Sequence, residues 1–420
     1  MFERGPSLHL FSNGKYPRII SHVPRDYASF ELKWGPLTGK DKRAWLSKNK
    51  SSKTEKRRET LVVNDIDRFY PPLADWIFES FRFIPNWRMD DGQISLSEIG
   101  GGIGPHVDNY DVFLIQMCGT RTWQVGRKKI SAHEERDRMI DGLDVRVLSG
   151  WPLNEGGSGE QEMEEWIVYP GDLLYLPPRV AHCGISLSGD CMTLSVGCRA
   201  PSVSDLLSKL AEHLSSSIED YSILRYTDFD LLKGRKSGAS PGELTLDAKE
   251  RAKQLVMDSL TSIVNDDEWW DEFLGRYVTE QKRVRHSYPI PLDSLLVDAE
   301  DAHSTVQSVF AGNGVLCQAE GIAFAYSTVR PKRHDGREYH RFFVNGEMWQ
   351  SASQSNNTKQ SSLVRIFQIV ANHREINRSL LLLGLDSSHD PDDHVDMLSF
   401  EAVAFLEELV STGVLYGSNL

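Results

Sequence analysis

Two histidines and one aspartate in this chain have the residue types and the spacing of metal ligands. His106 and Asp108 are separated by one residue, and His182 lies in a later segment that follows a Pro-Gly-Asp turn and an apolar run. Side chains alternate between the two faces of an extended strand, so His106 and Asp108 are expected to project in the same direction. Two imidazoles and one carboxylate leave coordination positions open. This ligand set suits Fe(II) with a bidentate oxoacid and dioxygen, although zinc accepts the same ligand types.

In many chains a His-x-Asp pair is only part of a surface loop. The neighbouring residues are therefore needed to decide whether this pair binds a metal. A glycine-rich stretch, 100–104, precedes the pair and lets the backbone pass close to a neighbour. Arg121 follows on the next strand-like segment, with Trp123 and Val125 on the same face. A guanidinium buried there would be an unpaired charge unless an anionic ligand arrived, and its planar fork matches a carboxylate. Iron together with an arginine that holds a dicarboxylate indicates 2-oxoglutarate as cosubstrate.

Several longer stretches carry a resemblance to a known family. They are KWGP at 33–36, FIPNWRMDD at 83–91, the block 100–116, the turn and strand at 170–177, and RAP at 199–201. Through these stretches residues 15–205 resemble the JmjC-type, cupin-like 2-oxoglutarate oxygenases, and in particular the bacterial ribosomal oxygenase group. The resemblance implies a double-stranded β-helix (jelly-roll) core. It also implies an activity, hydroxylation of an arginine side chain of large-subunit ribosomal protein sixteen.

The resemblance also implies roles for individual residues. His106, Asp108 and His182 become the iron ligands at the catalytic centre, and Arg121 and Ser95 become contacts of 2-oxoglutarate. Ser195 lies on the run 192–197, the expected last strand of the barrel, where its hydroxyl could share the distal carboxylate of the cosubstrate. The alternative for Ser195 is an ordinary strand serine.

Residues just beyond the metal pair or the last strand are candidates for binding the substrate peptide. On this ground Tyr110, Asp111 and Arg199 are expected to line the peptide channel. Asp90 and Asp91 could engage a cationic substrate, with a solvated turn as the alternative because two acids precede a glycine.

The chain is too long for one core, and its patterning predicts an α+β protein in three parts. Residues 1–203 form the double-stranded β-helix catalytic domain. After Pro201 the alternation gives way to helical periodicity, which predicts a helical domain over 204–287. Residues 288–420 mix strands and helices in a pattern that resembles a winged helix. In the resembling family the helical module mediates dimerisation, so a homodimer is expected.

Composition and charge limit the classes of binding partner and the compartments that are expected for this protein. The net charge of -13 argues against direct nucleic-acid binding, yet an acidic protein can attract a basic ribosomal protein as its substrate. The lysine- and serine-rich segment 40–58 is interpreted as a solvated loop, with an RNA contact as the alternative. No apolar run reaches membrane-span length and no secretory signal is recognised, so the protein is expected to be soluble and intracellular. The cytoplasm is the expected compartment, unless an organellar targeting peptide has been removed.

Three classes of function remain open at this point. The leading one is the ribosomal-protein arginine hydroxylase. The second is another JmjC activity, histidyl hydroxylation or lysyl demethylation, which would be recognised by oxidation of a histidine peptide or by release of formaldehyde. The third is a non-catalytic cupin that binds a metal as a scaffold, which the joint presence of three ligands and the cosubstrate arginine disfavours.

Overall fold

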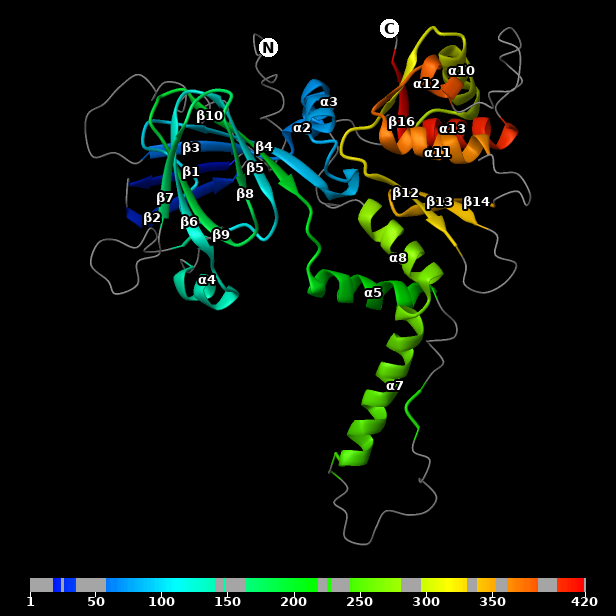
Figure 1. Cartoon of the computed structure of the whole chain (residues 1–420), viewed down its shortest axis with the longest axis horizontal. Helices are drawn as coiled ribbons and strands as arrows, with labels where there is room; N and C mark the ends of the chain where they lie inside the picture. Colours follow the sequence, from blue (N-terminus) through cyan, green and yellow to red (C-terminus); the bar gives the residue numbers. More distant parts are fainter. Residues whose placement is uncertain are drawn as a thin grey trace. The chain divides into compact units, whose positions relative to one another are not determined.

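The structure is a computed structural model that describes residues 18–23, 26–34, 58–139, 147–148, 163–217, 225–227, 242, 244–280, 296–330, 338–352, 361–383 and 399–418. It has two compact units, Met1–Ala200 and Pro201–Leu420 (Figure 1). Apart from Arg58, the predicted lysine- and serine-rich loop lies outside the described residues, as does the predicted boundary at residue 287. The division into three domains therefore stays a prediction.

The first unit contains two antiparallel sheets in its described residues. The larger sheet has the order β2 (Asp26–Trp34), β1 (Arg18–Val23), β3 (Arg58–Val63), β4 (Met89–Ser97), β10 (Cys191–Cys198), β5 (Val112–Cys118) and β8 (Leu173–Leu176). The smaller has the order β7 (Met163–Val168), β6 (Arg121–Lys129) and β9 (Val180–Ser186). From β5 onward the chain passes back and forth between the two sheets (Figure 1). This is the winding of the predicted cupin-like double-stranded β-helix, so the core of the fold prediction is confirmed.

The larger sheet carries apolar side chains on both faces at β5, where it separates two clusters. On its outer face Ile115, Leu194 and Val196 pack with the helices α2 (Ile66–Phe69) and α3 (Pro71–Ser80). On its inner face Val112 and Leu114 meet Trp123 of the smaller sheet. Alternate residues of one strand thus serve two cores, as expected for a sheet covered on both sides. The helices cover the outer face of the larger sheet, and its inner face borders the space between the two sheets.

The second unit combines helices with two small sheets. Its helices are α5 (Val203–Ser217), α7 (Leu246–Val264), α8 (Asp267–Thr279), α10 (Ala299–Phe310), α11 (Ser362–Asn372), α12 (Arg378–Leu383) and α13 (Phe400–Ser411). One sheet has the order β15 (Glu375–Ile376), β11 (Val315–Gln318) and β16 (Leu415–Ser418), and the other β12 (Phe324–Val329), β13 (Tyr339–Val344) and β14 (Glu347–Ala352). The largest core of this unit gathers side chains from α10, α11, α13 and the strands β11 and β13.

Helix α8 lies against the sheet β12–β13–β14, although the sequence assigns it to the preceding helical domain. Arg341 on β13 donates to the Glu268 carbonyl at 2.7 Å and to Asp271 at 3.2 Å. A Cβ placed on Gly275 of α8 would lie 2.4 Å from the ring of Phe343, so glycine permits the close approach. In the described part of the chain, no helix is long and apolar enough to cross a membrane.

Candidate metal centre

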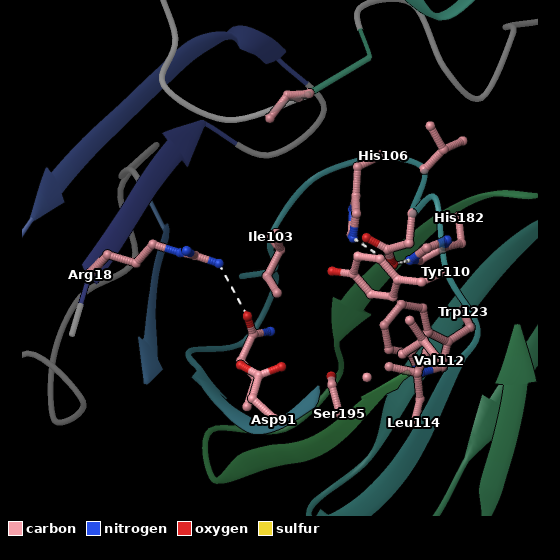
Figure 2. Close-up of a pocket in the computed structure, with 15 residues that line it drawn as sticks. Arg18, Asp91, Ile103, His106, Tyr110, Val112, Leu114, Trp123, His182 and Ser195 are labelled. Carbon is pink, nitrogen blue, oxygen red and sulfur yellow. Dashed lines mark hydrogen bonds and ion pairs between the residues drawn. The ribbon is translucent and has the colours of Figure 1, made fainter. Parts of the chain in front are cut away.

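His106 and His182 are brought side by side by a short piece of antiparallel pairing. The His106 N–H donates to the His182 carbonyl and the His182 N–H donates to the His106 carbonyl, both at 3.0 Å. Asp108 completes the group, with Oδ2 at 3.6 Å from His182 Nε2 and 3.9 Å from His106 Nε2. Figure 2 draws the side chains of His106 and His182 close together at one end of the pocket. Their ligand atoms all lie within 4.8 Å of each other, close enough to hold one metal ion.

Backbone carbonyls orient both imidazole rings. His106 Nδ1 lies 2.8 Å from the Gly104 carbonyl, and His182 Nδ1 lies 3.0 Å from the Val180 carbonyl. A carbonyl only accepts, so each Nδ1 carries the proton and each Nε2 presents its lone pair toward Asp108. Burial and the nearby His106 lower the pKa of His182 to about 4. The ring of His182 is therefore neutral near pH 7, which is the form that coordinates a metal.

The glycine-rich approach to the metal pair is required by a close backbone contact. A Cβ on Gly102 would lie 2.1 Å from the Gly184 carbonyl oxygen, and one on Gly184 would lie 2.7 Å from the ring of Trp123. Gly104 has a φ of +94°, which favours glycine on its own. The predicted close approach thus occurs, and the neighbour is the backbone of β9, the strand that carries His182.

A cavity of about 210 Å³ opens between the sheets beside the three ligands. Of the residues predicted for the cosubstrate or the substrate, Ser195, Tyr110 and Asp91 line it (Figure 2). Trp123, expected on the same face as Arg121, also lines it, whereas sequence reasoning missed Arg18, Gln93, Val112 and Leu114. Arg18 donates to Gln93 at 3.2 Å across the strands β1 and β4. The polar lining near Asp91 and Gln93 lies on the strand β4, whose alternate positions face inward.

Asp111 and Arg199 do not line the cavity. The Asp111 carboxylate accepts from Arg88 at 3.0 Å and from the Tyr175 hydroxyl at 2.7 Å. This contact raises the pKa of Tyr175, because the hydroxyl proton is held by the carboxylate. The backbone carbonyl of Arg199 accepts from the Arg88 side chain. The structure thus gathers Asp111 and Arg199 around Arg88, and their role toward a substrate stays a prediction. Asp90 is also outside the lining.

Arg121 is buried deeper in the barrel, with 1% of its surface exposed. Its Nη2 donates to Ser97 Oγ at 2.8 Å, its Nε lies 3.4 Å from Cys191 Sγ, and its guanidinium lies 5.6 Å from the centre of the Trp123 ring. None of the carboxylates in the described residues forms an ion pair with it. A buried cation without a counter-ion is costly, which keeps Arg121 as the candidate for binding an anion.

The polar side chains around Arg121 include residues that sequence reasoning missed. Thr60 Oγ1 donates to Ser97 at 3.1 Å, and Thr193 Oγ1 donates to Gln116 at 2.8 Å. Ser95, the predicted cosubstrate contact, is buried between Thr193 and Val62 in the sheet register, whereas Ser97 is the serine that touches Arg121. The signal was present in the sequence. Alternate positions along β4 are all polar, Asp91, Gln93, Ser95 and Ser97, in a strand whose inner face borders the barrel.

Comparison with known proteins agrees with this geometry. Residues 76–206 match the family model described as JmjC domain. A curated protein of Haemophilus influenzae described as a probable ribosomal oxygenase is 27% identical over 289 residues, which are 69% of this chain and 63% of that protein. The ribosomal protein uL16 3-hydroxylase of Escherichia coli is 30% identical over 218 residues, 52% of each chain. The chain thus matches between about half and two thirds of the length of these relatives.

Solved structures of Escherichia coli YcfD have the same overall fold. One covers 98% of this chain and 89% of its own, with a TM-score of 0.62 and 22% identity. Another, of equal TM-score, is YcfD in complex with cobalt and 2-oxoglutarate.

Residues 76–206 therefore match the JmjC class, and the facing sheets and the three converging ligands of the first unit agree with that match. Within that class the chain resembles the bacterial ribosomal oxygenases, as its sequence stretches indicated.

Proposed function

We propose that this protein is an Fe(II)- and 2-oxoglutarate-dependent oxygenase that hydroxylates an arginine side chain of ribosomal protein uL16, the large-subunit protein sixteen. The observation that carries the proposal is the buried Arg121 without a described carboxylate partner, in the same barrel as the three metal-ligand side chains. A metal-binding scaffold has no need for an unpaired buried guanidinium, whereas a dicarboxylate cosubstrate supplies the missing charge.

The residues present fit both groups. His106, Asp108 and His182 would hold the iron, and the Nδ1 contacts fix the rings so that Nε2 points to it. Arg121 and Ser97 would bind the distal carboxylate of 2-oxoglutarate, and Ser195 lies on the cavity wall. The iron, with dioxygen and the cosubstrate, supplies the oxidising power for an unactivated C–H bond. The chain itself contributes orientation, and Val112, Leu114 and Trp123 give the cavity apolar walls that exclude water.

A cationic substrate suits the cavity lining. Asp91 and Tyr110 face the space beside the ligands, and Asp91 offers a carboxylate to an incoming guanidinium. The net charge of -13 would speed the encounter with a basic ribosomal protein and make it sensitive to salt. A ribosomal substrate would place the protein in the cytoplasm or in an organelle that contains ribosomes.

Mass spectrometry of a uL16 peptide tests the proposal. The peptide is incubated with the protein, Fe(II), ascorbate and 2-oxoglutarate, and a gain of one oxygen on an arginine is expected. The matched control is the same peptide with that arginine replaced by lysine. Oxidation of a histidine peptide, or formaldehyde release from a methylated lysine peptide, would favour the other JmjC activities. No consumption of 2-oxoglutarate with any of these peptides would favour a non-catalytic cupin.

We also propose that the protein forms a homodimer through its helical segment and that the segment 288–420 is a winged-helix-like domain used for protein docking. Leu246, Met257 and Val264 support the first idea, because all three are more than half exposed and, at 100° per residue, fall on one stripe of α7. The second idea is supported by β11 lying between β15 and β16 beside helices of the same core. Sedimentation at micromolar concentration should give a dimer. A variant with Met257→Glu should shift it toward monomer, and a monomer in the unaltered protein would contradict the assembly.

A further inference from the structure

Arg179 lies immediately before β9, three residues ahead of His182, and has a backbone conformation that is rare for its type. Its φ is +71°, in the left-handed region, where a residue with a Cβ is strained. Glycine or asparagine would adopt this conformation more readily. A strained arginine beside a candidate metal centre indicates that its side chain is needed at this position.

Three parts of the barrel end meet at Arg179. Its N–H donates to the Asp108 carbonyl at 2.8 Å, and its own carbonyl accepts from the Ile130 N–H at 2.9 Å. Its side chain donates from Nε to the Ile130 carbonyl at 3.0 Å and from Nη1 to Asn109 Oδ1 at 2.9 Å. The residue thus connects the loop that carries Asp108, the chain just after β6 and the start of β9.

Glu135 anchors the guanidinium from the other side. It lies on the short helix α4 (Ala132–Arg138), its side chain is 1% exposed, and it forms an ion pair with Arg179 Nη1. A capping box formed by Ser131 and Glu134 fixes the start of that helix. Breaking the ion pair would leave the buried Glu135 carboxylate without a cation, which is unfavourable. The pair therefore holds Arg179 against α4.

We propose that Arg179, held by Glu135, is a positioning residue for the metal ligand Asp108. Neither Arg179 nor Glu135 lines the cavity, so both act through other residues. The contacts of Arg179 to the Asp108 carbonyl and to the neighbouring Asn109 set the direction in which the Asp108 carboxylate leaves the loop. This inference rests on the metal centre of the proposed function.

The test is titration of the metal-free protein with Co(II), which stands in for Fe(II) and gives a visible spectrum that depends on ligand geometry. Arg179→Gly removes the side chain and relieves the backbone strain. We expect its affinity for Co(II) to fall by about 10- to 100-fold, the usual effect of losing an outer partner of a metal ligand, and its Co(II) bands to change. Glu135→Gln keeps the shape and should give a smaller loss of the same sign. Arg179→Lys should rescue part of the affinity, because it keeps the charge and loses the fork.

The matched control is Arg68→Ala. Arg68 pairs with Asp65 at 3.4 Å, both side chains are nearly buried, and Asp65 also has a positive φ, yet neither residue lines the cavity. This variant should lose stability in urea while its Co(II) affinity and spectrum stay as in the unaltered protein.

Three results would overturn the inference. The first is unchanged affinity and spectrum in Arg179→Gly, or in Glu135→Gln should the glycine variant not fold. The second is an equal loss of affinity in Arg68→Ala, which would reduce the role of Arg179 to general stability. The third is failure of the unaltered protein to bind Co(II) at all, which would overturn the proposed metal centre itself and is distinguishable from the other two.

Discussion

Replacing Arg121 with methionine should separate the stability of the free protein from its ability to bind a cosubstrate. The Arg121 side chain is 1% exposed and forms no ion pair with a described carboxylate, so methionine removes an uncompensated charge at similar length. Ser97 keeps its hydrogen bond from Thr60 after the change. We expect the free protein to be as stable as before or up to about 3 kcal/mol more stable.

Although Arg121→Met should not destabilise the free protein, it should weaken the binding of 2-oxoglutarate. Removing one partner of a buried, hydrogen-bonded charge pair costs about 2–5 kcal/mol, which corresponds to roughly 30-fold to several thousand-fold in the dissociation constant. At a concentration of 100 times its dissociation constant, the cosubstrate should stabilise the unaltered protein by about 2.7 kcal/mol. At that concentration the methionine variant should gain at most about 0.9 kcal/mol for a 30-fold loss of affinity, and almost nothing for a loss of several thousand-fold.

Two measurements check these expectations. Urea unfolding without cosubstrate gives the free energy of unfolding, and calorimetric titration of the Co(II)-loaded protein with 2-oxoglutarate gives the affinity. Arg121→Lys should be intermediate in affinity, because an ammonium supplies the charge without the planar fork. Co(II) affinity should be the same in all three proteins. Unchanged 2-oxoglutarate affinity in the methionine variant would refute the assignment of Arg121.

Three further outcomes are expected from single substitutions. Asp108→Ala should abolish turnover and weaken Co(II) binding, because only two imidazoles remain, and an unaltered Co(II) titration would contradict its role as a ligand. Ser97→Ala should weaken 2-oxoglutarate binding by roughly 10-fold, since a hydroxyl bonded to a charged group is lost, whereas Ser95→Ala should change it less; calorimetry ranks the two. Gly102→Ala should be among the most destabilising changes, because its Cβ would meet the Gly184 carbonyl at 2.1 Å; a urea midpoint like that of the unaltered protein would count against this packing.

The metal-ligand side chains and Arg121 could be predicted from the sequence, because these residue types rarely occur together at this spacing. The spacing of His106 and Asp108, with His182 after a turn and a buried strand, predicted a cluster that the structure brings together. Arg121 was found because a basic residue on an otherwise apolar strand face demands an explanation. These signals are local, so a single sequence carries them.

Other parts of the site depend on tertiary contacts that local patterns do not contain. Ser95 and Ser97 have the same type and lie on the same face of β4, and only the sheet register places Ser97 against Arg121. Arg179 and Glu135 are 44 positions apart, and nothing in either segment announces their pairing. Likewise the periodicity of α8 indicates a helix but does not reveal that the sheet β12–β13–β14 is what it packs against.

The mutual hydrogen bonds between His106 and His182 have a consequence for the folding of the chain. The two residues are 76 positions apart, so their contact is non-local and the entropy of closing the intervening loop must be overcome before it forms. The ligand set consequently does not exist in a chain whose two sheets have not yet met. The amount of metal bound by newly made protein would then report the fraction of molecules whose two sheets have come together. A bound ion would also slow the separation of His106 from His182.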